Sequence, residues 1–137
     1  MSRFYLSFEN SFCQSYVSEK YFKLFENVDV IPVVRGGLDY KRYLARGSFI
    51  DASDFQSAQD LARYLLYLSK HRKRYTRMLE LKDRWTAHNV EPFHCRMCER
   101  LHTDLSPGHF TNLKEALQPD GECWPPDDLG DAGPGTT

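Results

Sequence analysis

The sequence contains no long apolar run, since no stretch of it approaches the ~20 residues that a transmembrane helix needs. The N-terminal stretch also lacks the apolar core of a signal peptide before its first acidic residue. The sequence also has no excess of charge of one sign, because its formal net charge is −1. Such a balance argues against a protein whose role is to coat nucleic acid or an anionic membrane. No internal repeat is present.

What the chain does contain is typical of a single folded domain. Its 137 residues are enough for one hydrophobic core. Hydrophobic residues make up 41% of the sequence and aromatic residues 14%, as in globular proteins. The cysteines are even in number, which permits a disulfide framework with three possible connectivities: Cys13, Cys95, Cys98 and Cys123. Composition alone leaves the redox compartment open.

The stretch from residue 4 to residue 20 organises the chain. Phe4, Leu6 and Phe8 alternate with other residues at the period of a β-strand. A polar loop follows over residues 9–17, and Ser18-Glu19-Lys20 has the composition of a helix start. Ligands of open α/β sheets bind beyond the carboxyl ends of the strands, and a helix N-terminus with a lysine nearby suits a phosphate. We therefore predict a strand, a ligand-facing loop and a helix.

A second strand is predicted over residues 28–34. This run is rich in β-branched residues, which is typical of a strand buried on both faces. Pro32 within it favours an edge or bulged position, because proline donates no ladder hydrogen bond. Gly36-Gly37 then predicts a turn that uses positive φ. The alternation of strands and helices indicates an α/β fold.

Two helices are predicted after a short strand at residues 48–51. Ser53-Asp54 is expected to cap the first, which continues to about residue 70. The second is basic and covers about residues 72–85. The basic run at 70–74 allows a nucleic-acid interpretation, but the same residues make an exposed helix face. With a net charge near zero, we expect no nucleic-acid partner.

Three motifs occur in order in the first part of the chain. They are Phe-Tyr-Leu-Ser-Phe-Glu-Asn-Ser from residue 4, Tyr-Val-Ser-Glu-Lys from residue 16 and Ile-Pro-Val-Val from residue 31. This series resembles the donor-binding signature of the α1,3-fucosyltransferases of glycosyltransferase family 10. The likeness covers roughly residues 3–85, through Gly36-Gly37, Ser48-Phe49-Ile50 and Asp54-Phe55. Residues 93–98 and Cys123-Trp124 resemble the cysteine-bearing tail of the invertebrate and plant core-type branch.

The resemblance implies the Rossmann-like C-terminal half of a two-domain GT-B glycosyltransferase. Residues 1–85 would form its GDP-fucose-binding domain, residues 86–124 an irregular cysteine-bearing tail, and residues 125–137 a disordered end. Family members carry a membrane anchor, a stem and an acceptor-binding domain in front of this half, and they face the Golgi lumen. We therefore expect the chain to be the C-terminal portion of such an enzyme, with its membrane attachment and its glycan acceptor contacted through that N-terminal part.

The family transfers L-fucose from GDP-fucose to a GlcNAc hydroxyl of a glycan with inversion, at an α1,3 linkage. By resemblance, Lys20 would stabilise the pyrophosphate, Glu19 would bind the ribose, Asn10 would contact donor oxygens, and Tyr16 would contact the nucleotide. The family's catalytic base is a carboxylate of the N-terminal domain, so no catalytic residue is expected in this chain. Glu9 is expected to support the loop. The donor is a substrate, and no tightly bound cofactor is predicted.

The cysteines leave two interpretations open. The resemblance favours disulfides among Cys95, Cys98, Cys123 and Cys13. Cys13 lies beside the donor loop and would be unpaired if its partner belonged to the N-terminal part of the enzyme. Cys95-x-x-Cys98 is also half of a structural zinc site. Several further metal-ligating side chains lie near it in the sequence: His94, His102, His109 and Cys123. The alternatives to an active enzyme are thus a non-catalytic donor-binding fragment or a zinc-stabilised binding module.

Overall fold

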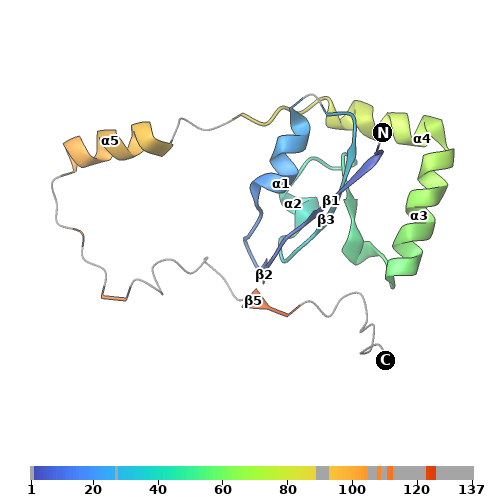
Figure 1. Cartoon of the computed structure of the whole chain (residues 1–137), viewed down its shortest axis with the longest axis horizontal. Helices are drawn as coiled ribbons and strands as arrows, with labels where there is room; N and C mark the ends of the chain where they lie inside the picture. Colours follow the sequence, from blue (N-terminus) through green and yellow to red (C-terminus); the bar gives the residue numbers. More distant parts are fainter. Residues whose placement is uncertain are drawn as a thin grey trace.

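The computed structural model describes residues 2–26, 28–88, 93–104, 108, 111–112 and 123–125. Within them a parallel sheet has the strand order β1-β3-β4. Strand β1 is Phe4–Phe8, β3 is Ile31–Arg35 and β4 is Ile50–Asp51. Helices lie on both sides of this sheet (Figure 1). The predicted α/β class is therefore confirmed, and the first two strands pair in parallel.

Pro32 lies in the central strand of the described sheet, so the predicted edge or bulge is wrong. It pairs with Tyr5 of β1. The N–H of Ile31 points toward β1, where it donates to the Arg3 carbonyl at 3.0 Å. Because N–H groups alternate along a strand, the absent N–H of residue 32 faces β4, which pairs only from Val33 onward. The proline thus removes no ladder hydrogen bond.

Each face of β3 supports a separate core. Ile31 and Val33, both fully buried, pack in one cluster with residues of β4, of the turn after it and of the helices α3 (Ala58–Lys70) and α4 (Arg72–Lys82): Ile50, Ala52, Leu61, Leu68 and Tyr75. Val34 packs on the opposite face with Tyr21, Tyr40 and Phe49. The predicted burial of this strand on both faces is confirmed, and it gives three layers with the sheet in the middle.

Two short helices lie on the Val34 side. Helix α1 is Glu19–Phe22 and continues as the 3-10 helix η1, Lys23–Phe25. Helix α2 is Tyr40–Tyr43, and Asp39 caps it by accepting the Arg42 N–H at 3.2 Å. Helix α1 therefore begins at Glu19, where the sequence predicts a helix start.

Helix α3, Ala58–Lys70, begins later than predicted. Its cap is Ser57, whose hydroxyl accepts the Asp60 N–H at 3.1 Å. The predicted cap Ser53-Asp54 instead belongs to a 3-10 helix, η2, Ala52–Asp54. Both segments carry the serine and aspartate chemistry of a helix start, and only the tertiary position of η2 at the end of β4 distinguishes them.

Helix α4, Arg72–Lys82, is attached to the η1 segment by a buried lysine. The Lys82 side chain is only 3% exposed, and its ammonium donates to the carbonyls of Leu24 (2.7 Å) and Val28 (2.6 Å). Burial lowers the pKa of Lys82, because the charged form loses hydration. The basic run at residues 70–74 lies exposed at the α3–α4 junction, as a solvated helix face does.

The tail is not wholly irregular, which corrects the prediction for residues 86–124. Phe93–Thr103 form an eleven-residue helix, α5, and Cys123–Trp124 form strand β5. Every residue of α5 is exposed, including Phe93 at 78% and Leu101 at 68%. Apart from Pro125, the predicted disordered end lies outside the described residues. Among the described helices, none has the length and apolar character that a membrane span requires.

Candidate functional site

The carboxyl ends of β1 and β3 meet at one edge of the sheet. The Glu9 N–H, directly after β1, donates to the Arg35 carbonyl at the end of β3 at 2.8 Å. The loop that follows contains a short strand, β2, Phe12–Cys13, and leads to α1. Ligands of open parallel sheets bind at such a position because the loops there diverge. The strand, loop and helix therefore stand in the predicted order.

Glu9 holds this loop against the start of α1. Its side chain is 7% exposed, and Oε1 accepts the Ser18 N–H at 2.9 Å. The Glu9 carboxylate thus accepts a hydrogen bond from a backbone N–H at the start of the helix, where the Ser18 side chain makes no capping hydrogen bond. The expectation that Glu9 supports the loop is confirmed.

The four predicted donor-site residues lie on this loop and at the start of α1. The Lys20 ammonium donates to the Phe8 carbonyl, the last of β1, at 2.9 Å. The Tyr16 hydroxyl donates to Asn10 Oδ1 at 3.1 Å. Glu19 is the first residue of α1 and is exposed. The fold thus joins Asn10 with Tyr16 and places the half-buried Lys20 at the carboxyl end of β1.

A cavity of about 360 Å³ opens beside this loop. It is lined by residues from the loop after β1, from β2, from β3 and from the tail: Glu9, Asn10, Ser11, Phe12, Arg35, Cys123, Trp124 and Pro125. Of the four predicted residues, Asn10 lines it, whereas Tyr16, Glu19 and Lys20 lie outside its lining. The Arg35 guanidinium lies over the Phe12 ring, 4.7 Å from its centroid, and provides a positive charge at the cavity wall.

The two glycines after β3 are required by close approach. A Cβ on Gly37 would lie 2.5 Å from the Cys13 carbonyl oxygen and 2.6 Å from its nitrogen. A Cβ on Gly36 would lie 2.4 Å from the Tyr40 hydroxyl and 2.9 Å from Glu9 Cγ. Among the described glycines, positive φ occurs at Gly47 (80°), so the predicted use of positive φ at 36–37 is wrong. These glycines instead let β2 pack directly on the turn.

Tyr40 lies beneath the same turn with its hydroxyl next to Glu9. The phenol is 2% exposed, and burial raises its pKa well above the ordinary value, with the nearby carboxylates of Glu9 and Asp51 adding to the shift. Within the described residues its hydroxyl and Glu9 Oε2 have no hydrogen-bond partner. Tyr40 is therefore a neutral phenol that backs the loop.

A disulfide joins Cys13 of the loop to Cys123 of the tail. Cys13 is thus paired within this chain, and its partner does not belong to the N-terminal part of the enzyme. Cys95 and Cys98 are free and exposed, so their predicted participation in disulfides is wrong. The reason is positional, since both lie on the exposed helix α5, whereas β5 pairs directly with β2 and brings the other two cysteines together.

The zinc alternative loses part of its ligand set in this arrangement. Cys123 forms a disulfide with Cys13 and so provides no thiolate for a metal, and His109 lies outside the described residues. No group of three or more His, Cys, Asp or Glu side chains able to hold a metal occurs in the part of the chain that the structure describes.

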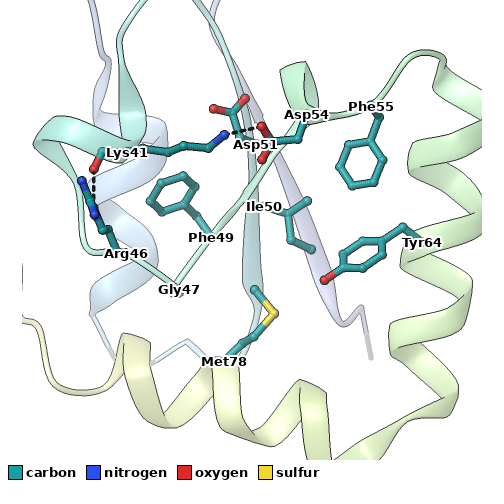
Figure 2. A pocket seen from close by; sticks show the side chains of 10 residues that line it. All are labelled: Lys41, Arg46, Gly47, Phe49, Ile50, Asp51, Asp54, Phe55, Tyr64 and Met78. Atoms are coloured by element: carbon teal, nitrogen blue, oxygen red, sulfur yellow. Dashed lines mark hydrogen bonds and ion pairs between the residues drawn. The ribbon is translucent and has the colours of Figure 1, made fainter.

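A larger cavity, of about 450 Å³, lies over β4 between α2, α3 and α4. Its wall is largely aromatic and apolar, with Phe49, Phe55, Tyr64 and Met78 around it (Figure 2). The Lys41 ammonium reaches across to Asp54 and forms an ion pair with it (Figure 2). None of the four predicted donor-site residues lines this cavity. Its second cation, Arg46, donates through Nε to the Lys41 carbonyl at 2.9 Å.

Two residues of the smaller cavity were not predicted. Arg35 follows the second predicted strand, and its position at the carboxyl end of β3 was the available signal. Trp124 reaches the cavity because β5 pairs with β2, with Phe12 opposite Trp124. No local pattern predicts a contact between segments so far apart, although the cysteine next to Trp124 was a hint.

Comparison with known proteins gives a consistent set of relatives. Residues 1–116 match the family model described as glycosyltransferase family 10 (fucosyltransferase) C-term. The chain is 41% identical over 115 residues to alpha-(1,3)-fucosyltransferase C of Drosophila melanogaster, covering 84% of this chain and 26% of that protein. It is 33% identical over 127 residues to glycoprotein 3-alpha-L-fucosyltransferase A of the same organism, covering 88% and 25%.

A human relative shows the same partial coverage. Alpha-(1,3)-fucosyltransferase 4 of Homo sapiens is 37% identical over 105 residues, which is 72% of this chain and 20% of that protein. The chain therefore spans about a quarter or less of the length of these curated relatives.

Proposed function

The chain belongs to glycosyltransferase family 10, the fucosyltransferases, and we propose that it is the donor-binding part of an enzyme that transfers L-fucose from GDP-fucose. The fold is then the Rossmann-like C-terminal half of a GT-B enzyme. The parallel sheet, with helices on both faces and a loop at its carboxyl edge, supports this assignment. The observation that carries it is the position of the Lys20 ammonium, which reaches from α1 to the end of β1, where the loop that holds Asn10 and Tyr16 begins.

Lys20 supplies the charge that the leaving group needs. Departure of GDP places negative charge on the diphosphate, and an ammonium beside it lowers the energy of that state. The hydrogen bond of Lys20 to the Phe8 carbonyl uses one of its three donors and fixes its direction. Its remaining donors are those that would contact the phosphate oxygens.

The other donor-site residues orient the nucleotide. Tyr16 donates to Asn10 Oδ1, so the Asn10 amide is held with its N–H groups directed toward a ligand. The exposed Glu19 carboxylate is an acceptor suited to ribose hydroxyls. Glu9 is not a catalytic base in this proposal, because its carboxylate is buried and engaged with the Ser18 N–H.

We propose inverting chemistry at an α1,3 linkage to a GlcNAc of a glycoprotein glycan. The names of the relatives support this linkage, and one of them includes the word glycoprotein. The base that removes the acceptor proton is assigned by family resemblance to an N-terminal domain, as are the acceptor contacts and the attachment to the Golgi membrane. This chain by itself then binds donor without transferring fucose. A non-catalytic donor-binding role is the second candidate, supported by the partial coverage of the relatives.

Calorimetric titration of GDP-fucose into the purified chain tests the donor site. Lys20→Gln keeps a donor for the Phe8 carbonyl but removes the charge, and we expect it to weaken GDP binding about tenfold or more while guanosine binding changes little. Lys41→Gln, at the exposed ion pair with Asp54, is the matched control and should leave both unchanged. Equal loss for GDP and guanosine would contradict the diphosphate role of Lys20. Fucose turnover by the isolated chain would contradict the assignment of the base to another domain.

A further inference from the structure

Strand β5 forms one wall of the cavity at the carboxyl edge of the sheet. It pairs antiparallel with β2, with Trp124 opposite Phe12 and Cys123 opposite Cys13. The disulfide between the two cysteines fixes this pairing covalently across a separation of 110 residues. The tail is therefore tied to the loop that carries Asn10.

Trp124 is the large aromatic surface of this cavity. Its side chain is 41% exposed although it is next to the disulfide, whereas Phe12 on the opposite strand is buried at 6%. A partly exposed indole at a cavity wall suits stacking with a flat ring. The Asn10 side chain, whose amide could hydrogen-bond to such a ring, and the positively charged Arg35 also line this cavity.

The ring that fits these groups is a purine. Asn10 accepts from Tyr16 through Oδ1, so its N–H groups are the donors it offers to a ligand. Guanine presents O6 and N7 as acceptors on one edge. Lys20 lies outside the cavity lining, at the end of β1. Because Lys20 does not line the cavity, a base bound there and a diphosphate bound at Lys20 would occupy separate parts of the site.

We propose that Trp124 is the stacking platform for the guanine base of the donor, and that the Cys13–Cys123 disulfide holds it in place. This inference rests on the proposed GDP-fucose function and adds a tail residue to the binding site. Stacking of a base on an aromatic side chain contributes enough that alanine substitution weakens binding about 5- to 100-fold. The tail then takes part in nucleotide recognition.

The two tryptophans of the chain, Trp85 and Trp124, allow a direct test. In Trp85→Phe the only indole is Trp124, and we expect GDP to quench its fluorescence. In Trp124→Phe the only indole is Trp85, whose emission should stay unchanged while GDP still binds, since phenylalanine retains part of the stacking surface. Trp124→Ala should weaken GDP binding about 5- to 100-fold. Binding of inorganic pyrophosphate should be the same in Trp124→Ala and wild type, because pyrophosphate has no base to stack.

Reduction of the disulfide provides a second measurement on the unaltered chain. Cys123→Ser, or treatment of the wild type with a reductant, should lower GDP affinity to about that of Trp124→Ala, and Cys95→Ser should not. GDP binding that neither quenches Trp124 nor weakens in Trp124→Ala would overturn this inference and leave the proposed function standing. Failure of the wild-type chain to bind GDP at all would overturn both proposals. Equal loss of GDP and pyrophosphate binding in Trp124→Ala would show a structural role and overturn the stacking role.

Discussion

The sheet with its helices and the tail beyond α4 are held by different physical means. Residues 4–82 bury a core on each face of β3, where Ile31, Val33 and Val34 are fully inaccessible. Helix α5 in the tail buries none of its side chains, and Figure 1 shows it apart from the sheet. Strand β5, farther along the tail, is attached to the sheet region by a two-residue ladder and one disulfide.

The comparison shows that the residues of the candidate site are held in place by two kinds of contact. Hydrophobic burial positions Lys20 and Asn10 by fixing β1 and the loop after it. The covalent bond next to it positions the exposed Trp124 at the wall of the cavity that Asn10 also lines. Loss of burial should therefore unfold the sheet, whereas loss of the disulfide should chiefly release the tail. Four substitutions test this difference, from the largest expected effect to the smallest.

Leu68→Ala should have the largest effect on stability. Leu68 is 1% exposed between α3 and the sheet, and its truncation should lower the free energy of unfolding by about 2–5 kcal/mol through lost burial and a residual cavity. Leu66→Ala on the same helix and Leu101→Ala on α5 are exposed controls with expected changes within about 0.5 kcal/mol. Chemical denaturation measures all three. A loss at Leu101 comparable with that at Leu68 would show that the tail also folds by burial.

Cys123→Ser should be next. Removing a cross-link between residues 110 positions apart frees the unfolded chain, and the free energy of unfolding should fall by about 2–4 kcal/mol. Far-UV circular dichroism of the sheet region should change little. Cys95→Ser, at a free exposed thiol, is the control. If denaturation in non-reducing buffer gave the same midpoint for Cys123→Ser and wild type, the tail would contribute nothing to global stability.

Lys82→Met tests a polar attachment inside the sheet region. The substitution keeps the length of the side chain but leaves the Leu24 and Val28 carbonyls without their donor, and should cost about 1–3 kcal/mol. The loss is expected even though burial lowers the Lys82 pKa, because the two carbonyls remain buried or half-buried. Lys70→Met, at an exposed position of α3, is the control. An unchanged or higher stability in urea titration would show that the cost of burying the ammonium outweighs its two hydrogen bonds.

Tyr40→Phe should have the smallest effect at neutral pH. It removes a buried hydroxyl that has no partner among the described residues, so stability should stay equal or rise by up to about 1 kcal/mol. Because the folded-state pKa of Tyr40 is raised, the wild type should lose stability as the pH rises above the unfolded value of 10.0. Tyr40→Phe should show a shallower loss in that range than the exposed control Tyr43→Phe. Identical slopes in denaturation between pH 9 and pH 11, about one unit either side of the unfolded value, would contradict this.

Local patterns account for the strands and for most of the helices. Alternation in Phe4–Phe8 and the β-branched run ending at Val34 predicted two strands, and the structure has both, paired in parallel. Boundaries were less accurate where the same chemistry occurs twice. Ser53-Asp54 and Ser57 are both good caps, and only the packing of η2 at the end of β4 decides that α3 begins after Ser57.

The candidate site was predictable where its residues are close in sequence. Asn10, Tyr16 and Lys20 lie within one strand-loop-helix segment, so a motif specifies them together. The roles of Gly36 and Gly37 could not be inferred, because the atoms they make room for belong to Glu9, Tyr40 and Cys13. The disulfide partner of Cys13 was likewise one of three candidates until β5 paired with β2.

The amino-acid sequence by itself determined the α/β class, the strands and the loop that carries the candidate donor-site residues, because periodicity and capping act over a few neighbouring residues. Tertiary structure alone decided which cysteines pair, which turn glycines leave no room for a Cβ and that Trp124 lines the cavity. Those features depend on contacts between segments that are apart in the sequence, by 110 positions for the two cysteines, and the packing of the whole sheet region brings these segments together.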